Sequence, residues 1–399
     1  MKVIRLSKSC ISKREKNAVI KVLNKGFLGM GPVVKKFEAK LSKFFSRKVV
    51  CLNSGTAALH VALQASGISK NDEVIVPSLT YVASYQAISA TGAKPVACDI
   101  DLENLHMCPH DLKKKITKKT KAIVLINVLG NCSDLFEIKK IAKKKNIILI
   151  EDNCESLGSK LKNKYLGTFG DFSSFSFYYS HQITSGEGGM IACNSDEDYE
   201  ILFSLRSHGW FGGTRFYSRK FASYNKYAKK FSNLDPRYIF SNSGFNLRPT
   251  DIQAAIAHNQ FKRLDELKKM RNLNRNLIIK KIKNSKSWNN QFYFFEPVKN
   301  LEPSWMGLPI LLDEKYKKRK KKFIDFLDNA GIETRPIISG SFVNQPASKL
   351  YNLNKNNYKY PNAQRIQDLG FLIGLHTKKI STKNLNLIHG AFFKIDKIN

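Results

Sequence analysis

The chain has 399 residues, and its 67 basic and 32 acidic side chains give a formal net charge of +35 at pH 7. This length corresponds to about two or three ordinary domains and provides enough material for a large core. Hydrophobic residues make up 42% and charged residues 25%, a globular composition that excludes a disordered or collagen-like chain.

The apolar runs of the sequence are short. The runs at 122–126 and 147–150 are far below the roughly 18 residues that a membrane span needs. Lys2, Arg5 and Lys8 interrupt the start of the chain, so it does not read as a secretory signal. We therefore expect no membrane partner and a cytoplasmic location.

The seven cysteines lie far apart in the sequence. They include no C-x-x-C pair and no zinc-like spacing. We expect reduced thiols rather than a disulfide framework, and no metal site.

Three basic runs, at 113–115, 143–145 and 317–322, raise the question of nucleic-acid binding. Apolar residues at helical spacing, such as Ile138 and Ile141, accompany them. This pattern is typical of amphipathic helices with a solvated face, and no nucleic-acid-binding module accompanies the charge. We expect no nucleic-acid partner, although a general attraction for anionic substrates remains.

From residue 49 to residue 193, short β-branched runs alternate with helical patterns such as 56–65 and 133–145. This alternation is typical of a parallel sheet with crossover helices, so the predicted fold class is α/β, with a large domain built on a mostly parallel sheet. The predicted strands are 49–52, 73–76, 94–99, 122–127, 147–151, 172–177 and 189–193.

The second half of the chain predicts a smaller α+β domain. Residues 211–240 lack periodicity and predict a long loop, either mobile or crossing to a partner subunit. A long helix is predicted from 250 to 275, with Thr250 and Asp251 at its N-cap. Strands at 307–311 and 333–338 and a closing helix after Thr382 follow. The predicted domains are 1–250, including an N-terminal arm, and 251–399.

Two polar stretches, 53–57 and 151–156, lie at the ends of predicted strands, where ligands of open α/β folds bind, and a third, 167–189, contains a predicted strand. Residues 53–57 (NSGTA) open a helix whose N–H groups can hold a phosphate, although a structural helix cap explains them equally well. Asp152, in 151–156 (EDNCES), could pair with a protonated ring nitrogen or cap the next turn. The glycines of 167–189 permit tight turns, and the hydroxyls of this stretch could close around a phosphate.

Together these motifs resemble those of the DegT/DnrJ/StrS-type sugar aminotransferases. The likeness runs in order from 27–31 (FLGMG) to 330–337 (AGIETRPI). It is carried by 53–59 (NSGTAAL), 151–156 (EDNCES), 167–180 (GTFGDFSSFSFYYS), 184–189 (TSGEGG) and 244–256 (GFNLRPTDIQAAI). The resemblance implies the fold of the pyridoxal-phosphate-dependent transferases of the aspartate aminotransferase type I, and a homodimer whose active sites lie at the subunit interface.

In that family a lysine that bonds the cofactor precedes the T-x-G-E-G-G turn by three residues. Here this position is His181, and Gln182 follows it. An imidazole cannot form the Schiff base by which the lysine holds pyridoxal phosphate. A histidine at this position is similar to that of the sugar 3-dehydratases.

The resemblance therefore implies a dehydratase that uses pyridoxal phosphate and pyridoxamine phosphate, with L-glutamate as amino donor and a nucleotide-linked sugar as substrate. His181 would act as general base and acid while the C3 hydroxyl of a 4-keto-6-deoxyhexose leaves and ammonia is released. The stretches at 151–156, 207–210 (SHGW), 244–249 and 335–337 are most similar to the branch that acts on GDP-4-keto-6-deoxymannose in colitose synthesis.

The resemblance also implies which residues hold the cofactor. Asp152 would keep the pyridine nitrogen protonated and so make the ring an electron sink. The phosphate would lie against Gly55, Thr56 and Ser176, with Asn246 reaching in from the second subunit.

Five further positions have implied roles with alternatives. Tyr81 would stack on the cofactor ring, where the GDP-sugar enzymes carry Trp, and Glu155 would contact the 3-hydroxyl of the ring. His208 is a second candidate proton carrier or substrate ligand, or a structural histidine. Arg248 and Arg335 would bind the glutamate carboxylate or a substrate phosphate, and a structural salt bridge explains each equally well.

Other hypotheses remain open. A CDP-sugar 3-dehydratase would need an iron–sulfur cluster with four ligands, but no cysteine follows Cys193. A sugar aminotransferase whose lysine was replaced by His181 is disfavoured by the dehydratase-like stretches at 151–156 and 207–210. A non-enzymatic family member would have no need to keep Asp152, Ser176 and the phosphate-loop residues.

Overall fold

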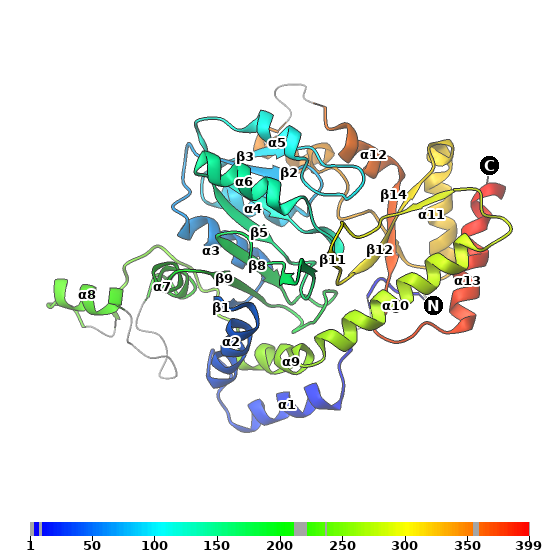
Figure 1. Ribbon diagram of the computed structural model, residues 1–399. Helices are drawn as coiled ribbons and strands as arrows, with labels where there is room; N and C mark the ends of the chain where they lie inside the picture. The colour runs from blue at the N-terminus through cyan, green and yellow to red at the C-terminus, as the bar shows by residue number, and fades with distance from the viewer. Residues whose placement is uncertain (1–3, 8–9, 211–221, 236–237, 354–358, 399) are drawn as a thin grey trace.

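The computed structural model describes residues 4–7, 10–210, 222–235, 238–353 and 359–398 (Figure 1). Its centre is a seven-stranded sheet with the order β1-β9-β8-β5-β4-β2-β3. The strands are β1 (Lys48–Leu52), β2 (Glu73–Pro77), β3 (Lys94–Cys98), β4 (Thr120–Ile126), β5 (Ile148–Asp152), β8 (Phe172–Ser176) and β9 (Gly189–Cys193). All seven strands predicted from the sequence are therefore confirmed.

The sheet is mostly, not wholly, parallel. The pairs β3–β2, β2–β4, β4–β5 and β5–β8 are parallel, whereas β9 runs antiparallel to both β8 and β1. The predicted mostly parallel sheet is thus confirmed, with antiparallel pairing at this edge. The β8–β9 connection turns back without a crossover helix, and strands joined in this way can pair only antiparallel.

Helices cover both faces of the sheet. The helices around this sheet are α1 (Lys13–Asn24), α2 (Pro32–Phe45), α3 (Gly55–Ala65), α4 (Val82–Ala90), α5 (Pro109–Lys115), α6 (Leu135–Lys145) and α7 (Asp196–Leu205). Successive side chains of β2 point to opposite faces: Val74 and Val76 pack with residues of α3 and α4, whereas Ile75 packs with residues of α5 and α6. Helices α3 and α6 are predicted from the sequence, whereas α1 and α2 are not.

A second sheet with the order β10-β12-β14-β13 forms the C-terminal part of the molecule. Its elements are β10 (Phe292–Phe294), β12 (Gly307–Leu312), β13 (Thr334–Arg335), β14 (Gly370–Gly374), α11 (Lys320–Asn329), α12 (Pro361–Leu369) and α13 (Thr382–Phe392). The predicted strand at 307–311 and the closing helix are confirmed. The predicted strand at 333–338 is wrong in length, because only two residues pair and Ile338 adopts a left-handed conformation with φ of 53°.

The predicted helix at 250–275 is two helices, α9 (Asp251–Phe261) and α10 (Leu264–Lys283). Its start is confirmed: the Thr250 side chain accepts from the backbone of Gln253, and the Gln253 side chain accepts from the backbone of Thr250. The break falls at Lys262 and Arg263, where Arg263 has ψ of 12°. It lets α9 pack against α1 and α2 while α10 leads to the second sheet (Figure 1).

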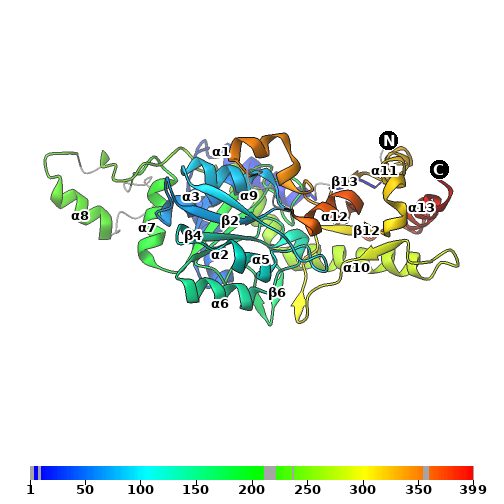
Figure 2. The same ribbon diagram turned by 90° about the horizontal axis from the view of Figure 1, so that it is seen from above.

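The predicted loop at 211–240 contains a helix, α8 (Ala222–Lys230), which corrects that prediction in part. Residues 211–221 and 236–237 lie outside the described residues. Figures 1 and 2 show α8 standing away from the body of the molecule, beyond α7. Whether this segment crosses to a partner subunit stays a prediction.

Short elements complete the described fold. A small sheet of β11 (Leu301–Glu302), β6 (Lys160–Leu161) and β7 (Lys164–Tyr165) ties the second half of the chain to the first. The 3-10 turns are η1 (Val128–Gly130), η3 (Glu314–Arg319), η4 (Phe342–Asn344), η5 (Pro346–Tyr351) and η6 (Phe393–Lys397). Among the described residues, none of the helices combines the length and apolarity required to cross a bilayer. The division into domains at residue 250 stays a prediction.

Candidate active site

The candidate site lies at the carboxyl ends of β5 and β8. Asp152 ends β5, faces Ser174 of the parallel strand β8, and is only 6% exposed. Its Oδ1 accepts from the Cys154 backbone at 3.1 Å and from Ser174 Oγ at 3.5 Å, and its Oδ2 accepts from Ser84 Oγ at 3.4 Å. Burial raises the pKa of Asp152, and these hydrogen bonds oppose the rise. Since Asp152 makes no ion pair within the described residues, it can receive a cation.

The neighbouring acid, Glu151, is bonded to the backbone of the turn that precedes β8. Its carboxylate accepts from the backbone N–H groups of Gly167, Phe169 and Gly170 at 2.7 to 2.9 Å. The backbone donors of Gly167 and Gly170 are therefore occupied by Glu151. The same contacts hold the turn that leads into β8.

The start of α3 supplies a close-packed cradle beside Asp152. Ser54 caps the helix by accepting from the backbone of Ala57 at 3.1 Å. A Cβ atom at the buried Gly55 would lie 2.7 Å from Ser176 Cβ and 2.9 Å from Cys154 Sγ. Because Asp152 and Cys154 are hydrogen-bonded to each other, Gly55 and Ser176 lie close to the carboxylate.

His181 lies in the turn after β8. Its ring packs edge-on against Tyr178 with 5.8 Å between the centroids, and its buried Nδ1 has no hydrogen-bond partner among the described residues. Burial lowers the pKa of His181 to about 4, and the charge of Arg271 acts in the same direction, while a backbone contact with Ser176 opposes both. The imidazole is therefore neutral at neutral pH and can accept a proton.

Glu155 is half-buried, three residues after Asp152. Its Oε2 accepts from the backbone N–H of Leu129 at 2.9 Å. Burial raises the pKa of Glu155 to about 7, and the charge of Asp152 adds to the rise. The turn that presents this N–H has Leu129 at φ of 53° and is held by His106, whose Nε2 accepts from Val128 N at 2.9 Å.

Other predicted site residues lie at the exposed rim. Thr56 is exposed in the first turn of α3, and Tyr81, with 63% of its surface exposed, caps α4 immediately before the helix that carries Ser84. Asn246 is exposed and forms a bridge with Ser207. The Leu247 carbonyl accepts from Asn53 N at 2.9 Å, which places this segment beside the start of α3.

His208, Arg248 and Arg335 are not bonded into this cluster. His208 is exposed and has φ of 62°, and Arg248 is half-buried in the segment next to Asn246. The Arg335 side chain is 64% exposed and pairs with Glu333 at 3.4 Å. A salt bridge was one of the two explanations that the sequence left open for Arg335. The roles of all three in binding substrate stay predictions.

Two residues that organise the turn around His181 (residues 178–185, the histidine turn) were not predicted from the sequence. Gln182, which is 1% exposed, donates to the carbonyls of Glu155 and Ser304. Arg271 of α10 donates to the carbonyls of His181 and Gln182. No local signal marks Arg271, because it stands in a basic helix and only its burial distinguishes it from its neighbours.

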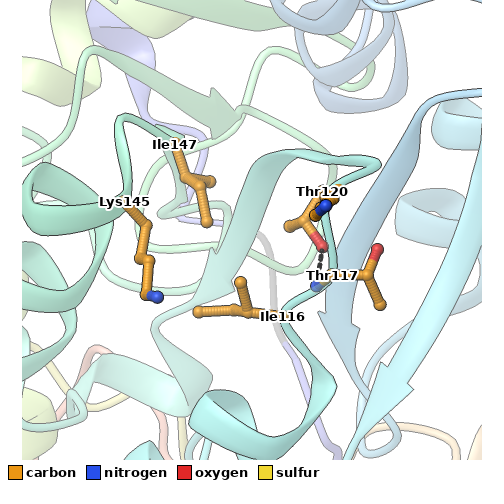
Figure 3. A pocket seen from close by; sticks show the side chains of 6 residues that line it. Ile116, Thr117, Thr120, Lys145 and Ile147 are labelled. Carbon is orange, nitrogen blue, oxygen red and sulfur yellow. Dashed lines mark hydrogen bonds between the residues drawn. The ribbon is translucent and has the colours of Figure 1, made fainter.

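A cavity of about 440 Å³ lies elsewhere (Figure 3). It is lined by Ile116, Thr117, Lys118, Thr120, Lys145 and Ile147. Thr120 begins β4 and Ile147 precedes β5, so this cavity is at the amino ends of the strands. It contains none of the residues described above. Among the described residues, no group of three or more His, Cys, Asp or Glu is placed to hold a metal ion.

Comparison with known proteins identifies the family. The family model of the DegT/DnrJ/EryC1/StrS aminotransferases matches residues 9–390, and the chain belongs to this family. The predicted family resemblance and fold class are therefore confirmed.

Two relatives and one solved structure illustrate the similarity. GDP-4-keto-6-deoxy-D-mannose 3-dehydratase of Escherichia coli O55:H7 is 32% identical over 372 residues, covering 91% of this chain and 92% of that protein. GDP-perosamine synthase of Escherichia coli O157:H7 is 37% identical over 268 residues, covering 67% of this chain and 68% of that protein. A crystal structure of GDP-4-keto-6-deoxymannose-3-dehydratase with a trapped PLP-glutamate geminal diamine superposes with a TM-score of 0.85 at 29% identity, covering 98% of this chain and 99% of that one.

Proposed function

We propose that this protein is a pyridoxal-phosphate-dependent 3-dehydratase of a nucleotide-linked 4-keto-6-deoxyhexose, with GDP-4-keto-6-deoxy-D-mannose as the preferred substrate. The observation that carries the proposal is His181, a neutral imidazole at the position where aminotransferases of this family have a lysine. The similarity to the 3-dehydratase along 91% of the chain supports it.

The residues of the site fit pyridoxal phosphate. Asp152 offers a buried carboxylate without an ion-pair partner among the described residues, which suits a protonated pyridine nitrogen. The N-terminus of α3, with Gly55 and Thr56, offers backbone donors for a phosphate, and Ser176 adds a hydroxyl beside Gly55. A Cβ at Gly55 would fill this cradle.

When bound, the cofactor supplies an electron sink for the carbons next to its nitrogen. His181 would accept a proton from C4′, the carbon of the cofactor that bears the amino group, and would return it to the C3 hydroxyl of the sugar, which leaves as water. Asp152 would keep the ring nitrogen protonated. Over the whole cycle, glutamate is oxidised to 2-oxoglutarate, the C3–O bond of the sugar is reduced, and the amino group is released as ammonia.

The proposal has finer parts that rest on the family resemblance. We place the enzyme in the cytoplasm as a homodimer with shared active sites, in which Asn246 of each chain reaches the phosphate of the other. Tyr81 stacks on the ring, Glu155 contacts its 3-hydroxyl, and His208, Arg248 and Arg335 bind substrates. The product serves the synthesis of a colitose-type dideoxysugar of lipopolysaccharide O-antigen.

Nucleotide-sugar aminotransfer is the second candidate function. The 37% identity to GDP-perosamine synthase favours it, since the name of that relative describes formation of an amino sugar. The same substrates distinguish the two functions, because an aminotransferase leaves the nitrogen on the sugar.

The deciding experiment records the absorbance spectrum of the protein with pyridoxal phosphate, then adds glutamate and then GDP-4-keto-6-deoxymannose while ammonia is assayed. We expect glutamate to produce the pyridoxamine form, and the sugar to give ammonia and a 3-deoxy product. His181→Asn should lower ammonia release by about 100-fold or more with cofactor binding retained. His110→Asn, a change at an exposed histidine of α5, is the matched control. An aminated sugar would support the second function instead.

A further inference from the structure

The histidine turn is hydrogen-bonded to two helices, α9 and α10, that are remote from it in the sequence. Arg271 of α10 donates from Nη2 to the His181 carbonyl and from Nη1 to the Gln182 carbonyl, both at 3.1 Å. Gln260 of α9 accepts at Oε1 from the Thr184 backbone at 2.9 Å. The turn is therefore hydrogen-bonded to α10 at residues 181 and 182 and to α9 at residue 184.

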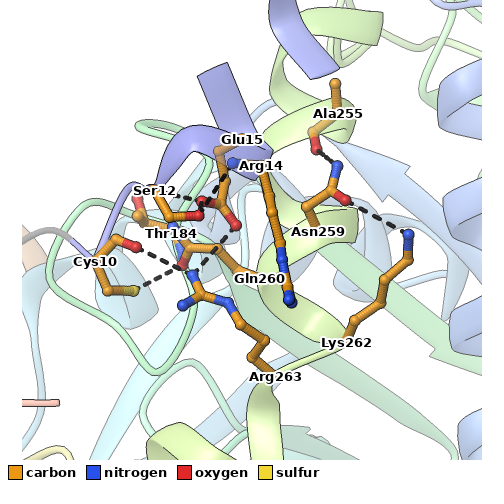
Figure 4. A network of polar contacts seen from close by, with 10 residues as sticks. All are labelled: Cys10, Ser12, Arg14, Glu15, Thr184, Ala255, Asn259, Gln260, Lys262 and Arg263. Atoms are coloured by element: carbon orange, nitrogen blue, oxygen red, sulfur yellow. Dashed lines mark hydrogen bonds and ion pairs between the residues drawn. The ribbon is translucent and has the colours of Figure 1, made fainter. Parts of the chain in front are cut away.

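The N-terminal arm, residues 10–15, is bonded to the same part of the molecule (Figure 4). The same Gln260 Oε1 that binds Thr184 accepts from the Cys10 thiol at 3.3 Å. Arg263 binds the Cys10 carbonyl at 3.0 Å and pairs with Glu15 at 3.2 Å. The arm and the histidine turn are thus linked to each other through Gln260 of α9, and the arm is also bonded to Arg263, just before α10.

Arg271 is an unusual group for a purely structural contact. It is 7% exposed, and it makes no ion pair within the described part of the chain. Arg275, one turn further along α10, is 5% exposed but pairs with Glu296 at 3.0 Å. Burying a guanidinium without an ion-pair partner is costly, so the two hydrogen bonds to these carbonyls must offset part of that cost.

The contacts of Arg271 set the direction of the His181 side chain. The peptide before His181 is fixed because its N–H donates to the Tyr178 carbonyl at 3.1 Å. The peptide after His181 is fixed because its carbonyl accepts from Arg271. With both flanking peptides held, the backbone angles of His181 are defined, and so is the direction of its Cα–Cβ bond.

We propose that Arg271 is a positioning residue of the active site, which aims His181 by fixing the peptides at 181 and 182. This inference rests on the proposed role of His181 as the proton carrier. The guanidinium also disfavours the imidazolium, so the free base is kept neutral, and a proton once accepted is readily given up to the leaving hydroxyl.

The test compares Arg271→Gln and Arg271→Lys with the matched control Arg275→Gln, all in the full-length holoenzyme. We expect Arg271→Gln to lower kcat for ammonia release by about 30-fold or more, with KM for the nucleotide sugar changed by less than about threefold. Arg271→Lys keeps the charge and should recover part of the loss. Arg275→Gln should leave kcat within about threefold of the parent protein.

A second measurement separates this inference from the proposed function. Hydrogen exchange of the backbone amides at 178–185 should become faster in Arg271→Gln and stay unchanged in Arg275→Gln, whatever reaction the enzyme performs. If Arg271→Gln does not fold, the Lys variant carries both measurements. Unchanged exchange at 178–185, or equal losses of kcat in the Arg271 and Arg275 variants, would overturn the inference. A failure of His181→Asn to reduce ammonia release would instead overturn the proposed function.

Discussion

At the scale of single residues, Gly55 is held to glycine by its neighbours. The first turn of α3 approaches β8 so closely that a Cβ atom would lie 2.7 Å from Ser176 Cβ. The neighbour on the other side is Cys154 Sγ, at 2.9 Å. Both atoms belong to residues next to the Asp152 carboxylate, so a shift of either changes the site.

We expect Gly55→Ala to destabilise the protein by about 1–3 kcal/mol, because the added methyl group overpacks this contact. The affinity for pyridoxal phosphate should fall by about tenfold or more, since Ser176 must move. Urea unfolding and a spectroscopic cofactor titration measure the two effects. Gly390→Ala in α13 is the control, because its Cβ meets no atom within 4 Å. Equal cofactor affinity in the Gly55 variant and the parent protein would contradict the assignment.

At the scale of elements, a buried ion pair ties three of them together. Glu38 of α2 accepts from Arg206 Nη1 at 2.5 Å and from the Cys51 backbone of β1 at 2.8 Å. Arg206, at the end of α7, is fully buried and also donates to the Cys51 carbonyl at 2.9 Å. The pair therefore supports the end of β1, after which the turn at 53–57 begins.

Glu38→Ala should cost about 3–5 kcal/mol of the free energy of unfolding, because it leaves the Arg206 guanidinium buried without this partner. The double variant with both residues changed to Met should be less destabilised than Glu38→Ala, since the buried guanidinium is then removed together with its carboxylate. Denaturant unfolding measures both. Asp196→Ala, which removes an exposed pair with Lys48, should cost less than about 1 kcal/mol. Similar costs for the buried and exposed pairs would show that burial is not the cause.

At the scale of the whole molecule, one core continues from the large sheet into the second sheet. The same buried cluster contains Val76 of β2, Leu308 of β12 and Phe392 of α13. The surface that surrounds this core carries the net charge of +35. A field of this sign attracts anionic substrates such as a nucleotide sugar, and added salt screens it.

We therefore expect kcat/KM for the nucleotide sugar to fall about fivefold or more when NaCl is raised from about 0.05 to 0.5 M. The kcat at saturating substrate should change by less than about twofold, because the field acts on encounter and binding. Initial rates at both salt concentrations provide the measurement. A kcat/KM independent of salt would mean that the positive charge is arranged away from the substrate path.

The sequence by itself determined the seven strands of the large sheet, the cap of α9 at Thr250, and the place of His181 and Asp152 in an ordered set of motifs. These features are local: alternation within a strand, a capping residue, or a residue type at a set distance from a glycine turn. Only the tertiary structure decided that the strand β9 runs antiparallel, that α9 and α10 are separate helices, and that Gly167 and Gly170 bind Glu151. The tertiary structure also brought Arg271 and Gln260 into hydrogen-bond contact with the histidine turn, although about 90 and 76 residues of sequence separate them from their partners. Contacts over such separations leave no periodic trace in the chain, because they depend on which faces the packed helices and strands turn toward one another.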